Sequence, residues 1–282
     1  MTVPVPKTYK LYVGGKFPRS ESGRSYQPAG NPAINVARGS RKDLRDAVVA
    51  ARAGLALWSG SSAYLRGQIL YRLAEMLESR RDALMQELQL GGASKAAAGK
   101  ELDTAISLTT WYAGLCDKVQ SLLGSQNAVQ GPFFNFSTVE PCGVVGVVAP
   151  AAPALVGTLA LILPVLVGGN AVIALVSEPA PFVGLALGEV CASSDVPAGA
   201  INLLSGHRSE LAPQFAAHRD VDALLLAGAP DAALSAAAAD NCKRVRYCDL
   251  PAGDWTQAGK LRSLQFVEPF VELKTLWHPV AQ

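Results

Sequence analysis

Charged and aromatic residues are scarce in this chain of 282 residues. Asp, Glu, Lys and Arg make up 17% of it and Phe, Trp and Tyr 7%, whereas half of the residues are hydrophobic. Disordered chains show the opposite balance, with many charges and few hydrophobic residues. The formal net charge of +2 attracts nucleic acid only weakly, and few rings are present to stack on single strands. We therefore expect a globular protein with a large core and no nucleic-acid partner.

Cysteine and histidine are too few and too scattered to suggest a familiar site. The cysteines are Cys116, Cys142, Cys191, Cys242 and Cys248, and no two of them form a CxxC pair. This spacing predicts neither a disulfide framework nor a metal site. The first residues lack the apolar segment of a signal peptide, so we expect the reducing cytoplasm.

One uncharged run, residues 143–176, is long enough on paper to span a bilayer. Prolines at Pro150, Pro153 and Pro164, together with several glycines, divide it into pieces of strand and short-helix length. A membrane span is the alternative. We expect instead the buried core of a parallel sheet and no membrane partner.

Helical periodicity dominates the first part of the chain after a glycine hairpin at Gly14–Gly15. Apolar residues recur every three to four positions, which predicts amphipathic helices. We expect three of them, over residues 43–55, 65–88 and 102–124.

From Cys142 onward, short apolar runs alternate with runs of helix length. Strands are expected at 144–149, 171–176, 200–204, 221–226 and 244–247, and helices at 154–167, 181–192, 209–217 and 231–240. This alternation predicts an α/β fold with a doubly wound parallel sheet, preceded by the helical segment.

Two further strands stand outside the alternation, at Phe133–Val139 and Phe266–Trp277. The second alternates with period two and follows a polar stretch, residues 251–263, that is typical of a linker. A lone strand leaves backbone groups unpaired, so we expect it to join a sheet edge of its own chain or of a partner.

Doubly wound sheets bind ligands at the carboxyl ends of their strands. The turns there offer Glu178, able to hold ribose hydroxyls; Gly206 and Arg208, able to hold an anion beside a helix N-terminus; and Gly228. The same residues also make ordinary capped turns, and no GxGxxG motif is present. Both interpretations stay open, and the structural one is preferred.

Cys248 is the only cysteine at the end of a predicted strand. A nucleophilic thiol needs a base and an oxyanion hole, and the sequence supplies no obvious candidate for either. The alternative, a small hydrophobic core residue, is the simpler interpretation.

Several motifs, in their order and spacing, resemble the aldehyde dehydrogenase superfamily. They include EPCGVVGVVAP, LPVLVGGNAV, DVPAGAINLLSG and HRDVDALLLAG, and the tail VELKTLWHP is similar to that family's C-terminal oligomerisation strand. The resemblance implies a Rossmann-like domain of the NAD(P)-binding type and a small β oligomerisation arm that joins subunits. It also implies a catalytic domain carrying a nucleophilic cysteine.

The chain departs from that family at the positions that carry chemistry. After Leu250 it lacks the family's catalytic domain and its cysteine. Ala152 stands where the family has an oxyanion-binding asparagine, and Leu175 where it has a cofactor-binding lysine. Ala229 replaces a serine that contacts the pyrophosphate, and Cys248 replaces the general-base glutamate.

The resemblance implies five parts in sequence. They are an N-terminal hairpin and helices in 1–121, an oligomerisation β segment in 122–141, a Rossmann-like core in 142–252, a linker replacing the catalytic domain in 253–264, and an oligomerisation strand in 265–282.

The leading hypothesis is a non-catalytic aldehyde-dehydrogenase-like subunit with a structural, assembly or regulatory role, similar to the non-catalytic second module of long aldehyde dehydrogenases. Its partner would be a full-length aldehyde dehydrogenase or a second copy, bound through Phe133–Val139 and Phe270–Trp277.

Two alternatives stay open. One is an NAD(P)-binding regulator, with Glu178, Gly206 and Gly228 as vestigial cofactor-binding residues. The other is oxidoreductase activity when a partner supplies the catalytic domain. We assign no catalytic residue and no metal, and expect no cofactor beyond weak NAD(P).

Overall fold

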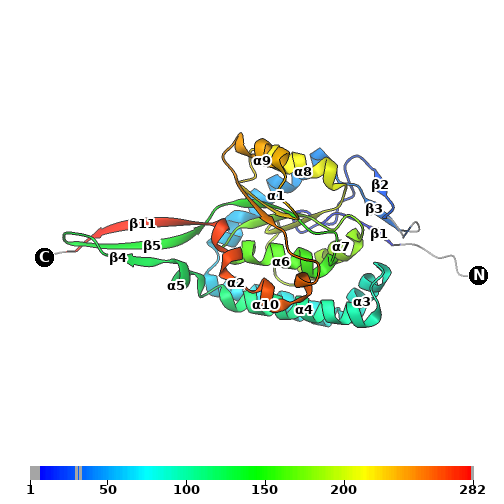
Figure 1. Cartoon of the computed structure of the whole chain (residues 1–282), viewed down its shortest axis with the longest axis horizontal. Coiled ribbons are helices and arrows are strands. Elements are labelled where there is room, and N and C mark those ends of the chain that lie inside the picture. Colours follow the sequence, from blue (N-terminus) through cyan, green and yellow to red (C-terminus); the bar gives the residue numbers. More distant parts are fainter. Residues whose placement is uncertain (1–6, 29–30, 32–33, 281–282) are drawn as a thin grey trace, which may run out of the picture.

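Five parallel strands form the central sheet in the computed structural model, which describes residues 7–28, 31 and 34–280 (Figure 1). The strand order is β10-β9-β6-β7-β8. The bounds are β6 (Val144–Val148), β7 (Ala171–Leu175), β8 (Ile201–Leu204), β9 (Ala223–Ala227) and β10 (Arg244–Cys248). All residues of β6, β7, β8 and β9 are buried, as their continuous apolar sequences require in a sheet covered on both faces. The predicted α/β fold is confirmed.

Helices cover both faces of this sheet. One face carries α6 (Ala154–Val167) and α7 (Pro181–Cys191); the other carries α1 (Arg41–Gly60), α8 (Arg208–Ala217) and α9 (Ala232–Ala239). Figure 1 shows these two layers above and below the strands. The uncharged run at 143–176 is thus β6, α6 and β7, buried inside the protein. Within the described ranges, no helix combines the length and the apolar character that a membrane crossing needs.

The helices that precede the sheet are α2 (Ala63–Ser79), α3 (Arg81–Leu90), α4 (Lys95–Leu115) and α5 (Val119–Leu123). The expectation of one helix over 65–88 is wrong, because the chain breaks at Arg80, which has φ −100° and ψ 19°. Leucines on both sides of the break, such as Leu77 and Leu84, bury into the same core cluster. Periodicity alone therefore does not reveal the interruption.

A small N-terminal sheet lies against the central one. It contains β1 (Thr8–Tyr9), β2 (Ser25–Tyr26) and β3 (Asn35–Ala37). The predicted glycine turn is present: Val13 and Lys16 exchange backbone hydrogen bonds, and both intervening glycines have positive φ. Tyr12 exchanges two backbone hydrogen bonds with Leu203, which attaches this segment to the β8 edge of the central sheet.

A narrow arm projects from the body of the molecule (Figure 1). It consists of β4 (Ser125–Asn127), β5 (Phe133–Pro141) and β11 (Val271–Pro279), with β5 in the middle. β11 runs antiparallel to β5 over its whole length, from Val271 opposite Pro141 to Pro279 opposite Phe133. The expectation that the terminal strand pairs with a sheet is confirmed.

The strand begins later than the alternating sequence suggested. Residues 264–270 form two short 3-10 turns, η2 (Leu264–Phe266) and η3 (Glu268–Phe270), so the predicted starts at Phe266 and Phe270 are corrected to Val271. Pro269 lacks the N–H that a ladder needs, and the Phe270 ring is buried in the core instead.

The chain passes from β10 to β11 through a packed segment, residues 249–270. It contains η1 (Asp254–Thr256) and α10 (Ala258–Leu261) before the two turns. Four of its side chains are almost fully buried: Trp255, Leu261, Val267 and Phe270. The Tyr112 hydroxyl on α4 donates a hydrogen bond to the Leu261 carbonyl. This segment therefore has the packing of a core element despite its polar sequence.

Candidate functional site

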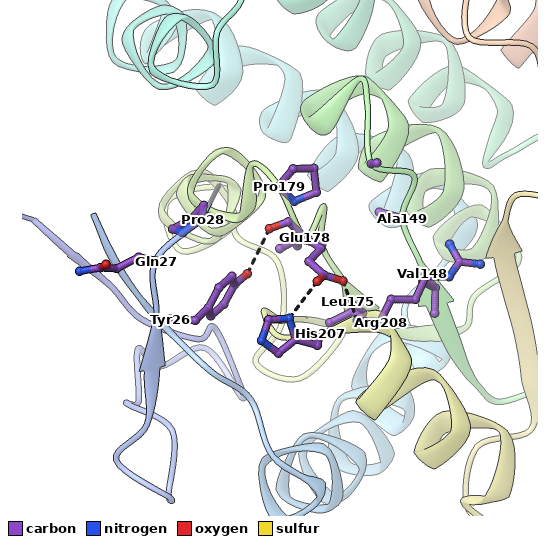
Figure 2. Close-up of a pocket in the computed structure, with 12 residues that line it drawn as sticks. Tyr26, Gln27, Pro28, Val148, Ala149, Leu175, Glu178, Pro179, His207 and Arg208 are labelled. Atoms are coloured by element: carbon purple, nitrogen blue, oxygen red, sulfur yellow. Dashed lines mark hydrogen bonds and ion pairs between the residues drawn. The ribbon is translucent and has the colours of Figure 1, made fainter. Parts of the chain in front are cut away.

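A cavity of about 470 Å³ opens at the carboxyl ends of β6 and β7 (Figure 2). Its floor is apolar, because Val148, Leu175 and Val176 end the two strands there. One wall comes from the N-terminal sheet, where Tyr26 points toward the turn after β7. The polar side carries Glu178, together with His207 and Arg208 at the start of α8.

Glu178 lies in the turn after β7, at the place where the sequence predicted it. Its two carboxylate oxygens are both engaged: the Arg208 backbone N–H donates to Oε2 at 2.9 Å, and His207 Nδ1 lies 2.8 Å from Oε1. Partial burial acts against ionisation, but these two contacts prevail and lower the pKa of Glu178 from its usual value. Glu178 therefore caps the N-terminus of α8 as an ionised carboxylate.

The two predicted glycines stay outside the cavity lining. Gly206 has φ +154° and packs against Leu211, where an added Cβ would meet the Leu211 side chain at 2.8 Å. Gly228 has φ +100° and donates its N–H to the Cys248 carbonyl. The structure thus brings only Glu178 of the three into the cavity. Both glycines sit in turns whose backbone conformation favours glycine.

Arg208 crosses from α8 to the end of β9. Its Nη2 donates to the Ala227 carbonyl at 2.7 Å, beside Gly228. Among the described residues, this guanidinium has no ion-pair partner. The sequence already drew attention to this cation, because it follows a glycine at the start of a helix. The role of Tyr26 was missed, since nothing local in the sequence links it to a turn far along the chain.

A second cavity of about 520 Å³ lies beside the first, at the N-terminus of α6. Glu101 on α4 reaches into it, and its Oε1 accepts hydrogen bonds from the backbone N–H groups of Leu155 and Val156. Burial raises the pKa of Glu101, although these two hydrogen bonds act in the opposite direction. Ala152, the residue expected in place of an oxyanion-binding asparagine, also lines this cavity and adds no polar group. The sequence did not predict the role of Glu101, because the spacing of residues within α4 does not indicate which other helix begins next to it in the fold.

A third carboxylate caps the N-terminus of α9. Asp231 accepts hydrogen bonds from the N–H groups of Ala233 and Leu234 at the start of α9. Helix N-termini are the usual binding sites for a pyrophosphate, because their N–H groups and dipoles favour anions. Three of those at this edge are occupied by the chain's own carboxylates: Glu101 caps α6, Glu178 caps α8 and Asp231 caps α9. The residues present therefore do not fit a dinucleotide bound through these helix ends.

Cys248 ends β10 and packs into the core with 6% of its surface exposed. Burial, helped by the nearby Asp249, raises the pKa of its thiol to about 11. A thiol with that pKa is almost entirely protonated at neutral pH and is a poor nucleophile. Among the described residues, no group of His, Cys, Asp and Glu side chains is arranged to hold a metal ion.

The family model and the similar proteins of known sequence point to the same family. The family model described as aldehyde dehydrogenase family matches residues 18–247. The cytosolic 1 aldehyde dehydrogenase of Elephantulus edwardii is 30% identical over 249 residues, covering 84% of this chain and 49% of that protein. Human retinal dehydrogenase 2 is 31% identical over 251 residues, covering 85% and 48% respectively. The chain spans about half the length of the curated relatives it matches.

Solved structures agree on the fold. PnpE from Pseudomonas sp. WBC-3 superimposes with a TM-score of 0.81 at 25% identity, covering 86% of this chain and 50% of that one. A betaine aldehyde dehydrogenase from Staphylococcus aureus, solved in complex with NAD+, gives a TM-score of 0.78 at 24% identity, with 85% and 49% coverage. PnpE has also been solved in complex with nicotinamide adenine dinucleotide.

Proposed function

Since the chain belongs to the aldehyde dehydrogenase family, we propose that it is a non-catalytic subunit that assembles with a full-length aldehyde dehydrogenase or with a second copy of itself. The observation that carries this proposal is the arm. Its strands extend beyond the body of the molecule (Figure 1). They leave apolar side chains exposed.

The arm leaves apolar side chains uncovered within this chain, although Asn135 and Ser137 in the middle of β5 are buried. After Val271, all residues of β11 are exposed, although their alternating sequence is typical of a strand with one covered side. The large apolar side chains include Leu273 at 59% exposure and Trp277 at 60%, with Phe133 and Phe134 on β5 also exposed. An apolar surface on a projecting element is characteristic of a contact with another chain. The outer edge of β11 adds backbone groups for a further strand.

The base of the arm is held firmly, as an assembly element requires. Asn170 is fully buried; it donates to the Phe270 carbonyl at 2.8 Å and accepts from the Gly143 N–H at 2.9 Å. One side chain thus joins the segment before β11 to the loop between β5 and β6. Arg244 on β10 adds a hydrogen bond to the Val271 carbonyl.

The lack of reactive groups supports the non-catalytic part of the proposal. The Cys248 thiol is buried and its pKa is raised, and the carboxylates at the carboxyl edge cap helices. Aldehyde oxidation through a thioester needs a thiolate, an oxyanion donor and a bound hydride acceptor held together. The described residues do not bring such a set into one place.

The test is assembly measured by native mass spectrometry, with this chain alone and mixed with a full-length aldehyde dehydrogenase from the same source. We expect a complex of defined stoichiometry, with a second copy or with the enzyme. The double variant L273S/W277S should weaken it at least about tenfold, because two apolar contacts are lost. The matched control V49S/Y71S changes exposed apolar residues on α1 and α2 and should assemble normally.

Two results would contradict the proposal. One is a monomer at all concentrations that does not associate with the enzyme. The other is an assembly that the arm variant and the control variant change equally, since the contact would then lie elsewhere.

A further inference from the structure

We propose that the cavity at the ends of β6 and β7 binds a small organic monoanion, an apolar body carrying one carboxylate, and excludes dinucleotides. This site is independent of the arm, so the inference does not rest on the assembly role. It departs from what family membership suggests, because the residues in the cavity do not fit a dinucleotide.

The floor of the cavity suits the apolar body. Val148, Leu175 and Val176 each have less than 3% of their surface exposed on the whole, and they form this floor with Ala149. A volume of about 470 Å³ falls within the range of roughly 300–1,000 Å³ that is usual for small-molecule sites. These side chains expose little surface of their own, so the gain on binding comes from the aromatic ring or short alkyl chain of the ligand, which leaves water when it lies against this floor.

Arg208 can bind the single negative charge of the proposed ligand. Its guanidinium makes one hydrogen bond, from Nη2 to the Ala227 carbonyl, and in the described part of the chain it meets no carboxylate at ion-pair distance. Figure 2 shows the guanidinium beside Val148, whereas the Glu178 carboxylate faces His207. The planar guanidinium has further N–H groups in the fork geometry that binds a carboxylate through two hydrogen bonds.

The other groups of the cavity reject a second negative charge. Glu178 is ionised and occupies the first N–H of α8, so a pyrophosphate placed there would face a carboxylate. Leu175 is apolar and buried, so it adds no second cation to the cavity. In the neighbouring cavity Glu101 holds the N–H groups at the start of α6. One cation beside these carboxylates matches one anionic group and not two.

The experiment uses benzoate as the probe, benzamide as a neutral molecule of the same shape, and NAD+ as the dinucleotide. Binding to the whole chain is measured by calorimetry and by the shift in melting temperature. We expect saturable binding of benzoate in the millimolar range or tighter, at least about tenfold weaker binding of benzamide, and no displacement of benzoate by NAD+.

Variants of Arg208 and Glu178 test which side chain holds the anion. Arg208→Gln should weaken benzoate binding at least about tenfold, whereas Arg246→Gln, the same change at an exposed position on β10, should leave it unchanged. Arg208→Lys keeps the charge and should give an intermediate affinity, which guards against a variant that merely misfolds. In Glu178→Ala, Arg208 remains the one cation of the cavity and Glu101 still holds the start of α6, so NAD+ should still not displace benzoate.

Four outcomes would overturn the proposal. They are the absence of saturable benzoate binding to the wild-type chain, equal benzoate affinity in the Arg208→Gln variant, displacement of benzoate by NAD+ from the wild-type chain, and displacement of benzoate by NAD+ from the Glu178→Ala variant.

Discussion

At the carboxyl ends of the strands in the central sheet, single carboxylates occupy the N–H groups at the starts of helices. Glu101 and Glu178 come from a helix and a turn, and each reaches the N-terminus of another helix. Their pKa values move in opposite directions, raised for Glu101 and lowered for Glu178, although both side chains are partly buried. Burial prevails in the first case, and the hydrogen bonds with the Arg208 N–H and with His207 prevail in the second. The same type of cap thus has an opposite dependence on pH at the two helices.

The raised pKa of Glu101 predicts a pH-dependent effect of Glu101→Gln. A carboxyl whose folded-state pKa lies above its unfolded value contributes stability at low pH that is lost as pH rises through the folded-state pKa. Glutamine still accepts both hydrogen bonds and does not titrate. The free energy of unfolding of this variant, relative to wild type, should therefore rise as the pH increases above the ordinary pKa of a glutamate, about 4.

Urea unfolding at several pH values checks this prediction. Glu101→Ala is the control: it loses the cap and should be less stable than the glutamine variant by about 1 kcal/mol at neutral pH. A difference between wild type and the glutamine variant that stays constant with pH, or that falls, would contradict the assigned direction.

Cys248 should resist alkylation in the folded protein. Its thiol is buried and its pKa is raised to about 11, whereas Cys242 is exposed. At pH 8 we expect iodoacetamide to label Cys248 at least about tenfold more slowly than Cys242, as followed by peptide mass spectrometry. In urea both should react at similar rates. Equal labelling in the folded state would show that Cys248 is accessible and would reopen a catalytic role.

At the scale of elements, the segment between β10 and β11 is the main surprise. Its polar composition is typical of a loose linker, yet it packs against α4 and α6 with Trp255, Leu261, Val267 and Phe270 buried. The Trp255 indole N–H donates to the Leu250 carbonyl, so this ring is both packed and hydrogen-bonded. Four well-placed apolar residues are enough to order a segment that contains many polar ones.

Trp255→Ala should therefore destabilise the protein by about 3–5 kcal/mol, the usual cost of removing a large buried ring. The nearby exposed Lys260 provides the control, and Lys260→Ala should change stability by less than about 0.5 kcal/mol. Chemical unfolding of both variants gives the comparison. If the tryptophan variant were as stable as wild type, the segment would be a linker after all.

The whole molecule is a compact α/β body with a projecting arm (Figure 1). It belongs to the aldehyde dehydrogenase family and spans about half the length of the relatives it matches. The arm carries exposed large apolar side chains, among them Leu273 and Trp277. The cavity lies in the body, between β6, β7 and the start of α8. The proposed assembly surface and the proposed ligand site therefore lie in separate parts of the structure.

The purified chain should not oxidise aldehydes by itself. With NAD+ and a panel of aliphatic and aromatic aldehydes, the absorbance of NADH at 340 nm should not rise faster than in a blank without protein, because the described residues do not bring a thiolate, an oxyanion donor and a hydride acceptor together. A full-length aldehyde dehydrogenase is the positive control. Turnover that disappears in the Cys248→Ser variant would refute the non-catalytic role.

Much of the fold was predictable from local patterns. The strands from Val144 to Cys248 and the helices between them lie close to their predicted positions, because continuous apolar runs and helical spacing report burial directly. The break at Arg80 and the late start of β11 were not predictable in this way. In both cases the apolar residues keep their spacing while the backbone changes direction.

The candidate site was predictable only in part. Glu178 and Arg208 were visible because they follow a strand and precede a helix, where ligand-binding residues of this fold occur. The contacts of these two residues could not be predicted. Glu178 caps α8 instead of pointing into open space, and Arg208 donates a hydrogen bond to the Ala227 carbonyl. Glu101 and Tyr26 come from distant parts of the chain, so local sequence has no signal for them.

By itself the sequence determined the layered α/β fold, the family resemblance and the presence of a terminal strand, since each depends on the order and spacing of apolar residues. Tertiary structure alone decided which backbone groups the carboxylates cap, which polar segment packs as core, and which face of the arm remains uncovered. These depend on contacts between residues far apart in the chain, whose distances and burial are set only when the elements come together.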